Sequence, residues 1–192
     1  MQLRKQKILN LGFIAAPTFA VAILLGLVLA VTALPKPGDV ASEKAIGKRV
    51  TDFTLDDQFE RALSAKFAGK HSIVLIGDRK GLETMRLWEE KALKAFGDKV
   101  QIVRVAYFKG MPFFVPRGLA RNEVKQKHPS ASVLCDWDGN ASAQFDYTDG
   151  CRIYFTDINA TIRAVSSGEC SPEKWQLFME SAQTYFQKTN IR

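Results

Sequence analysis

Three cysteines and two histidines are the residues of this chain best suited to nucleophilic, redox or metal chemistry. The thiols are Cys135, Cys151 and Cys170, and the imidazoles are His71 and His128. Their spacing contains neither a Cys-x-x-Cys pair nor two histidines on one helical turn, so a zinc or copper site has too few neighbouring ligands. We therefore predict no metal and no cofactor.

Cys151 and Cys170 flank two short β-rich runs, residues 152–157 and 161–165, which a tight turn separates. Because an antiparallel hairpin brings the residues beyond its two strands together, the sequence predicts a disulfide between them in an oxidising compartment. A structural bridge is favoured over a catalytic pair, since the two cysteines are far apart in sequence and have no neighbouring histidine. Cys135 ends an apolar strand and is interpreted as a buried thiol.

A polar loop flanked by glycines, residues 77–83, precedes a predicted helix. Free N–H groups at a helix N-terminus, with Arg79 and Lys80 beside them, are suited to an anion or to a partner. An ordinary solvated strand-to-helix loop is the competing interpretation. The residues of this candidate site are Asp78, Arg79, Lys80, Gly81, Leu82 and Met85.

The apolar pattern around these residues predicts a single α/β domain. Residues 72–76 form a continuous aliphatic run, which is typical of a central strand buried on both faces. The helix that follows ends at Gly97 and has a buried stripe of Met85, Trp88, Ala92 and Phe96. Further strands are predicted at residues 50–55, 62–67, 100–108 and 132–135, and further helices at residues 117–127 and from Pro172 to Phe186.

The order of these elements is a leading hairpin, then β-α-β-α-β, then a closing ββ-α. It resembles the thioredoxin-like fold in its redoxin branch, which includes peroxiredoxins and membrane-tethered thiol-disulfide proteins. The resemblance implies a central mixed sheet flanked by helices over residues 46–188. The segments that carry it are residues 47–55, 67–76, 136–139 and 162–164, with Gly168.

The same resemblance implies a reactive cysteine where the strand at residues 72–76 turns into the next helix. The matching Cys-x-x-Cys positions fall near Leu82 and Met85, which cannot attack a peroxide or a disulfide. The Pro-x-x-x-Thr-x-x-Cys pattern of peroxiredoxins is absent, as is the proline that redoxins usually carry before the strand starting here at Arg152. We therefore expect a redoxin that lacks the active-site cysteines.

Residues 8–35 contain no ionisable side chain. A membrane-spanning helix needs about 20 apolar residues, whereas the apolar region of a cleaved signal peptide has about 7–15. We predict a transmembrane helix at residues 8–34, with the preceding Arg4, Lys5 and Lys7 keeping the N-terminus cytoplasmic. The C-terminal domain is then on the outer, periplasmic or extracytoplasmic side. Cleavage after the small residues 31–33 is the alternative.

The predicted organisation leaves one domain outside the membrane. Three of the 27 basic residues precede the span and all 20 acidic residues follow it, so the exported part carries 24 − 20 = +4. No run of five like charges occurs, which argues against a nucleic-acid partner. The predicted parts are a cytoplasmic tail at residues 1–7, the transmembrane helix at 8–34, a linker at 35–45, the thioredoxin-like domain at 46–188 and a tail at 189–192.

Together these features predict a membrane-anchored, non-catalytic thioredoxin-like protein. We expect it to act as an accessory, assembly or interaction subunit of a membrane complex, with a protein as its partner. The alternative is a tethered thiol-disulfide oxidoreductase or peroxidase-related enzyme that works through Cys151 and Cys170. A third interpretation is a binder of small anions that uses Arg79 and Lys80.

Overall fold

The computed structural model describes residues 44–189. The predicted transmembrane helix at residues 8–34, the cytoplasmic tail and most of the predicted linker lie outside the described residues, so those expectations rest on the sequence. Between residues 44 and 189, none of the helices combines the length and the apolar character needed to cross a bilayer.

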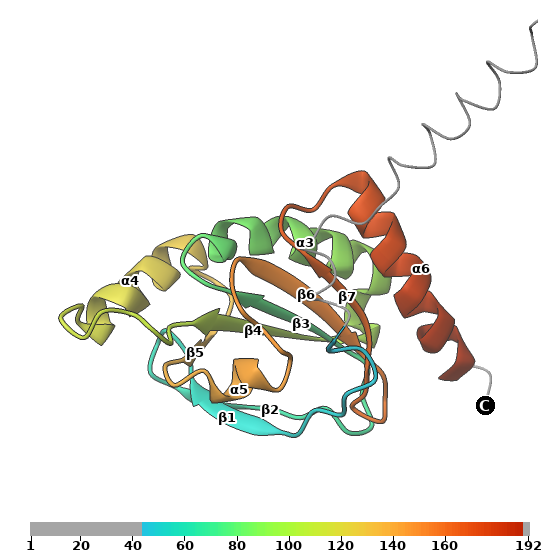
Figure 1. Ribbon diagram of the computed structural model, residues 1–192, viewed down its shortest axis with the longest axis horizontal. Helices are drawn as coiled ribbons and strands as arrows, with labels where there is room; N and C mark the ends of the chain where they lie inside the picture. The colour runs from blue at the N-terminus through green and yellow to red at the C-terminus, as the bar shows by residue number, and fades with distance from the viewer. Residues whose placement is uncertain (1–43, 190–192) are drawn as a thin grey trace, which may run out of the picture. The chain divides into compact units, whose positions relative to one another are not determined.

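A five-stranded mixed sheet forms the centre of the domain, with the strand order β5-β4-β3-β6-β7 (Figure 1). β3 lies in the middle, parallel to β4 and antiparallel to β6. All of its residues are buried, as expected for a continuous aliphatic strand covered on both faces. The predicted central strand is therefore confirmed. The five strands are β3 (Ser72–Gly77), β4 (Gln101–Tyr107), β5 (Leu134–Asp136), β6 (Cys151–Thr156) and β7 (Ile162–Ser167).

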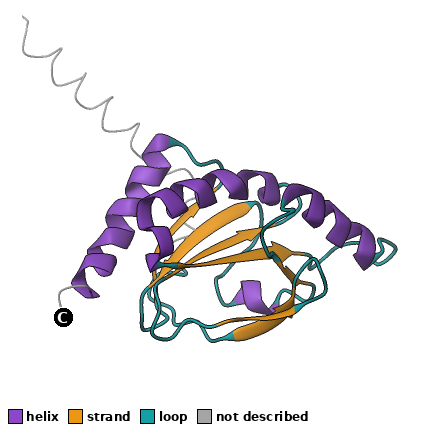
Figure 2. Cartoon of the chain, turned by 180° about the vertical axis from the view of Figure 1, so that it is seen from behind, coloured by secondary structure: helices purple, strands orange, loops and turns teal. Residues whose placement is uncertain are grey.

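The long helices lie along one face of this sheet (Figures 1 and 2). They are α3 (Gly81–Phe96), α4 (Arg117–Lys127) and α6 (Pro172–Thr189), and the short 3-10 helix η1 (Gly97–Lys99) follows α3 directly. The opposite face is covered by the short helix α5 (Asn140–Ala143) and by the N-terminal hairpin.

The core on the helical face centres on Trp88, which is fully buried. Its Nε1–H donates a hydrogen bond of 2.8 Å to the carbonyl oxygen of Gly168, just after β7. Its ring packs against Trp175 and Phe178 of α6, with centroids 6.1 and 6.0 Å away. One indole thus joins α3, α6 and the end of β7. The predicted stripe of α3 is buried throughout, at Met85, Trp88, Ala92 and Phe96.

The N-terminal hairpin is a separate antiparallel sheet of β1 (Phe53–Asp56) and β2 (Ala62–Ala65). β1 begins later than the predicted strand at residues 50–55, because the chain before it pairs elsewhere. The Gly47 N–H donates to the Ile162 carbonyl at 2.8 Å, and the Val50 N–H donates to the Ala160 carbonyl at 2.9 Å. Residues 47–50 therefore lie along the start of β7.

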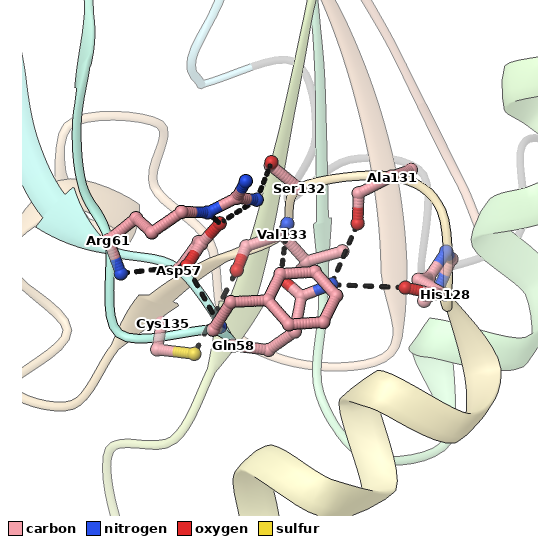
Figure 3. A network of polar contacts seen from close by, with 9 residues as sticks. Asp57, Gln58, Arg61, His128, Ala131, Ser132, Val133 and Cys135 are labelled. Carbon is pink, nitrogen blue, oxygen red and sulfur yellow. Dashed lines mark hydrogen bonds and ion pairs between the residues drawn. The ribbon is translucent and has the colours of Figure 1, made fainter.

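The hairpin turn is organised by Asp57, whose side chain is fully buried (Figure 3). The carboxylate accepts the N–H groups of Phe59 and Arg61 and pairs with the Arg61 guanidinium at 2.6 Å. Burial by itself would raise the pKa of Asp57, but these hydrogen bonds outweigh it and hold that pKa below its usual value. Asp57 also forms a β-bridge with Leu134 of β5.

Gln58 fastens the same turn to the chain that enters β5 (Figure 3). Its side-chain amide donates to the carbonyl oxygens of His128 and Ala131 at 3.0 and 2.7 Å. Its side-chain oxygen accepts the Val133 N–H at 2.8 Å. A buried amide with its donors and acceptor satisfied fixes the geometry of both segments.

The buried His71, directly before β3, predicts a loss of stability in acid. Its ring lies 5.5 Å from that of Phe155 and 5.0 Å from that of Phe186. Burial lowers the pKa of this imidazole, and the charge of Asp157 opposes the effect only in part. Because the unfolded chain binds the proton more readily, the free energy of unfolding falls as the pH drops below 6.5.

We expect the variant His71→Phe, which keeps the aromatic packing, to lose less melting temperature than the wild type between about pH 7.5 and 5.5. Thermal unfolding of the full-length chain in mild detergent, followed by circular dichroism, measures the difference. His128 also has a pKa lowered by burial, so part of the pH dependence should remain. Equal losses in the two proteins would contradict the assignment.

Candidate functional site

Asp78, in the loop between β3 and α3, is the centre of the predicted site. One carboxylate oxygen accepts the N–H groups of Lys80 and Gly81 at 3.0 and 2.8 Å. The other accepts the Gly150 N–H at 2.9 Å. The backbone N–H of Asp78 donates in turn to the Gly150 carbonyl at 3.1 Å. Asp78 therefore binds the first residue of α3 and ties it to the loop before β6.

This arrangement bears on the anion interpretation of the loop. Two of the N–H groups that would hold an anion, those of Lys80 and Gly81, already bind the carboxylate of Asp78. One of the two predicted cations is also engaged, because the Arg79 Nε lies 2.9 Å from a carboxylate oxygen of Glu123. The chain's own carboxylates thus take up two N–H groups and one cation of the predicted anion site.

The first turn of α3 is closed by contact between two backbones. A Cβ atom added at Gly81 would lie 1.9 Å from the carbonyl oxygen of Gly150, so this position accepts no side chain. Leu82 is 2% exposed and Met85 is fully buried, and both belong to the helical-face core. The two positions that match the cysteines of a redoxin are therefore apolar and buried.

In the described part of the chain all three cysteines are free thiols, so the disulfide between Cys151 and Cys170 stays a prediction. The register of β6 and β7 places the two residues near each other but not directly opposite. Arg152 lies opposite Ser167, and the Gly168 N–H donates to the Cys151 carbonyl at 2.8 Å. Cys151 thus faces Gly168, and Cys170 lies two residues further along the chain.

The electrostatic environment of the thiols disfavours nucleophilic chemistry. Burial raises the pKa of Cys151 to about 12, and the neighbouring Cys170 adds to the effect. Burial also raises the pKa of Cys135 to about 11 and shifts that of Cys170 upward. Because the thiolate is the reactive form, these groups are protonated and weakly reactive near neutral pH.

No group of three or more His, Cys, Asp or Glu side chains between residues 44 and 189 is placed to hold a metal ion.

A groove of about 870 Å³ opens beside the closed turn, between the start of α3 and α4. The loop after β4, residues 108–116, forms its third side. Of the predicted site residues, Asp78, Arg79 and Leu82 line the groove, whereas Lys80, Gly81 and Met85 do not. The remaining apolar lining comes from segments that the sequence analysis did not assign to the site, including Phe108, Met111, Val115, Leu119 and Val124.

The charged rim of the groove is neutralised internally. Lys127 lies 3.2 Å from carboxylate oxygens of both Glu83 and Glu123, and Arg79 binds Glu123 from the other side. Burial would raise the pKa of Glu123, but its bonds to Arg79 and Lys127 outweigh this and lower that pKa. The rim therefore joins α3 to α4, and the groove between them combines an apolar lining with these paired charges and with Asp78 and Lys109.

No protein-family model matches this chain, and no curated protein does. Several solved structures do match. DsbF of Mycobacterium tuberculosis, determined in mixed oxidised and reduced forms, is 17% identical with a TM-score of 0.51, over 69% of this chain and 94% of that one. The exposed lipoprotein thioredoxin Etrx1 of Streptococcus pneumoniae is 15% identical with a TM-score of 0.53, over 71% and 99%. StoA of Bacillus subtilis is 12% identical with a TM-score of 0.50, over 67% and 96%.

These likenesses confirm the predicted thioredoxin-like α/β fold, with its mixed sheet and flanking helices. The matching structures include proteins described as thioredoxins and one described as a thiol:disulfide interchange protein. At identities of 12–17% the likeness extends to the fold and not to the site. The function of the site therefore depends on its own residues and their geometry.

The contact between Gly81 and Gly150 predicts opposite effects for two similar substitutions. Gly81→Ala forces a methyl group against the Gly150 backbone, and overpacking of this kind costs roughly 1–3 kcal/mol or more. Gly118→Ala, in the exposed part of α4, meets nothing within 4 Å and should stabilise the protein by up to about 1 kcal/mol through helix propensity. Denaturant unfolding of the two full-length variants gives both values. A neutral Gly81→Ala would show that the closed turn is not a constraint.

Proposed function

We propose that this chain is a membrane-anchored, non-catalytic thioredoxin-like protein that acts as an accessory, assembly or interaction subunit of a membrane complex. The groove between α3 and α4 is the surface that binds the partner protein. The anchor in this proposal is the apolar segment at residues 8–34, which is long enough to span a bilayer.

The closed first turn of α3 is the observation that carries the non-catalytic part of the proposal. A catalytic thiol needs an exposed place at a helix N-terminus, where the thiolate is stabilised and can reach a substrate. Here the backbone of Gly150 fills that place beside Gly81, and Asp78 holds the two segments together. A negative charge at this point disfavours a thiolate as well.

The groove supports the binding part of the proposal. Its paired rim charges leave an apolar interior, and Leu119 at its edge is 63% exposed. The apolar lining fits an apolar segment of a partner, because the rim charges of Glu83, Glu123 and Lys127 already pair within the chain.

The competing function is a thiol-disulfide oxidoreductase or peroxidase-related enzyme that uses Cys151 and Cys170. The identity of the structural neighbours favours it, since they include DsbF and StoA. The two thiols of this chain are only 2% and 6% exposed, however, and burial raises the pKa of both. A substrate disulfide would have to enter the core to meet them.

The groove assignment predicts a difference between two matched surface variants. Leu119→Glu places a charge at the groove, whereas Leu177→Glu places one on α6 at a position that is 64% exposed. We expect the Leu119 variant to recover a stoichiometric partner about tenfold less efficiently in mild detergent, as for a binding hot spot. The Leu177 variant should recover it normally. Equal recovery with both variants would show that the groove is not the binding surface. A monodisperse protein without any partner would contradict the accessory role.

An activity assay separates the two functions directly. The full-length protein should change the rate of insulin reduction, or of peroxide consumption, by less than about twofold, because it lacks an exposed thiolate. A variant with both Cys151→Ser and Cys170→Ser should give the same background rate. Turnover that the wild type shows and the double variant loses would establish the enzyme instead.

A further inference from the structure

The loop between β4 and α4 carries two aromatic side chains that the rest of the domain does not cover. Phe113 is 99% exposed and Phe114 is 72% exposed. The two rings contact each other edge to face, with their centroids 5.9 Å apart. In Figure 1 this loop extends beyond the sheet, next to the start of α4. Exposing two neighbouring phenylalanines to water is unfavourable, and an exposed apolar patch of this kind often marks a binding surface.

The loop is held in shape, so the two rings are presented outward and do not fold back into the groove. The Met111 N–H donates to the Phe108 carbonyl at 3.0 Å, and the Val115 N–H donates to the Pro112 carbonyl at 2.9 Å. These two successive turns place Met111 and Val115 against the groove, whereas Phe113 and Phe114 do not line it. The aromatic pair is therefore a feature distinct from the groove.

Charge is distributed along this segment in a polarised way. Residues 110–116 are uncharged, and Lys109 and Arg117 stand at the two ends of that run. The Arg117 guanidinium lies 4.9 Å from the centre of the Trp137 ring. Within residues 44–189, no carboxylate forms an ion pair with Lys109 or Arg117. The loop therefore has an apolar tip, and the two cations at its base form no ion pair with a carboxylate of the described residues.

We propose that this loop inserts Phe113 and Phe114 into the interface of a lipid bilayer, while Lys109 and Arg117 contact the phosphates of anionic phospholipids. Aromatic rings favour the boundary between headgroups and hydrocarbon. Cations at the base of such a wedge add electrostatic attraction to anionic lipid. The inference goes beyond the proposed function, because it concerns a second surface and a different kind of partner.

Two features favour lipid over protein as the occupant. A protein interface needs shape complementarity around its aromatic anchors, whereas the Phe113 side chain is 99% exposed at the tip of its loop. A bilayer accommodates an apolar tip without a complementary surface. A domain tethered by a segment at residues 8–34 is also kept near the membrane, so even a weak contact is occupied at a high effective concentration.

Two matched tryptophan variants of the full-length chain, reconstituted into vesicles, test this proposal. Phe114→Trp puts a reporter at the tip, and Leu177→Trp puts one on α6 at a similarly exposed position. The vesicles contain phosphatidylcholine and phosphatidylglycerol, with or without bromine on the acyl chains, which quenches nearby indoles. We expect bromine to lower the fluorescence added at position 114 about twofold and to leave that at position 177 nearly unchanged.

A charge variant tests the contribution of the cations. Combining Phe114→Trp with Lys109→Gln and Arg117→Gln should reduce the quenching in anionic vesicles to the level in phosphatidylcholine alone, because the attraction to phosphates is lost. Quenching at position 114 that does not exceed that at position 177 would overturn the proposal. Cross-linking of a photoreactive residue at position 113 to a protein, without lipid quenching in vesicles, would make the loop a protein-binding surface instead. The vesicles contain no partner protein, so the result is independent of whether the groove binds one.

Discussion

The site depends on one constraint, which is the contact between the backbones of Gly81 and Gly150. The end of β3, the start of α3 and the loop before β6 meet at this point, and Asp78 holds them with both carboxylate oxygens. Because the contact leaves no room for a side chain at residue 81, the turn is sealed. The accessible concave surface lies beside this turn, in the groove between α3 and α4.

The rest of the domain keeps α3 in the position that this contact requires. Trp88 links α3 to α6 and to the end of β7, so the helix cannot move away from the sheet without breaking a partly buried hydrogen bond and separating these rings. On the other side, the ion pairs of Lys127 and Arg79 connect the start of α3 to α4. The thioredoxin-like scaffold thus positions an apolar groove with paired charges at its rim, and not an exposed thiol.

Much of the fold could be predicted from the sequence, because its signals are local. The aliphatic run of β3 and the buried stripe of α3 follow directly from their periodicity. The position of Cys170 relative to Cys151 could not, since it depends on the exact register of β6 and β7, in which Cys151 lies beside Gly168. The groove also escaped prediction, because its walls come from segments far apart in sequence, and the run at residues 111–116 indicated only a break in the pattern.

The segment before β2 has a consequence for how this domain meets other proteins. Residues 47–50 hydrogen-bond to the start of β7, and Asp57 pairs with Leu134 of β5, so one stretch of chain covers part of both outer strands of the sheet. Exposed strand edges invite strand addition and, with it, aggregation. Because these strand edges are partly covered, association through side-chain contacts is favoured over strand addition at the edge of the sheet.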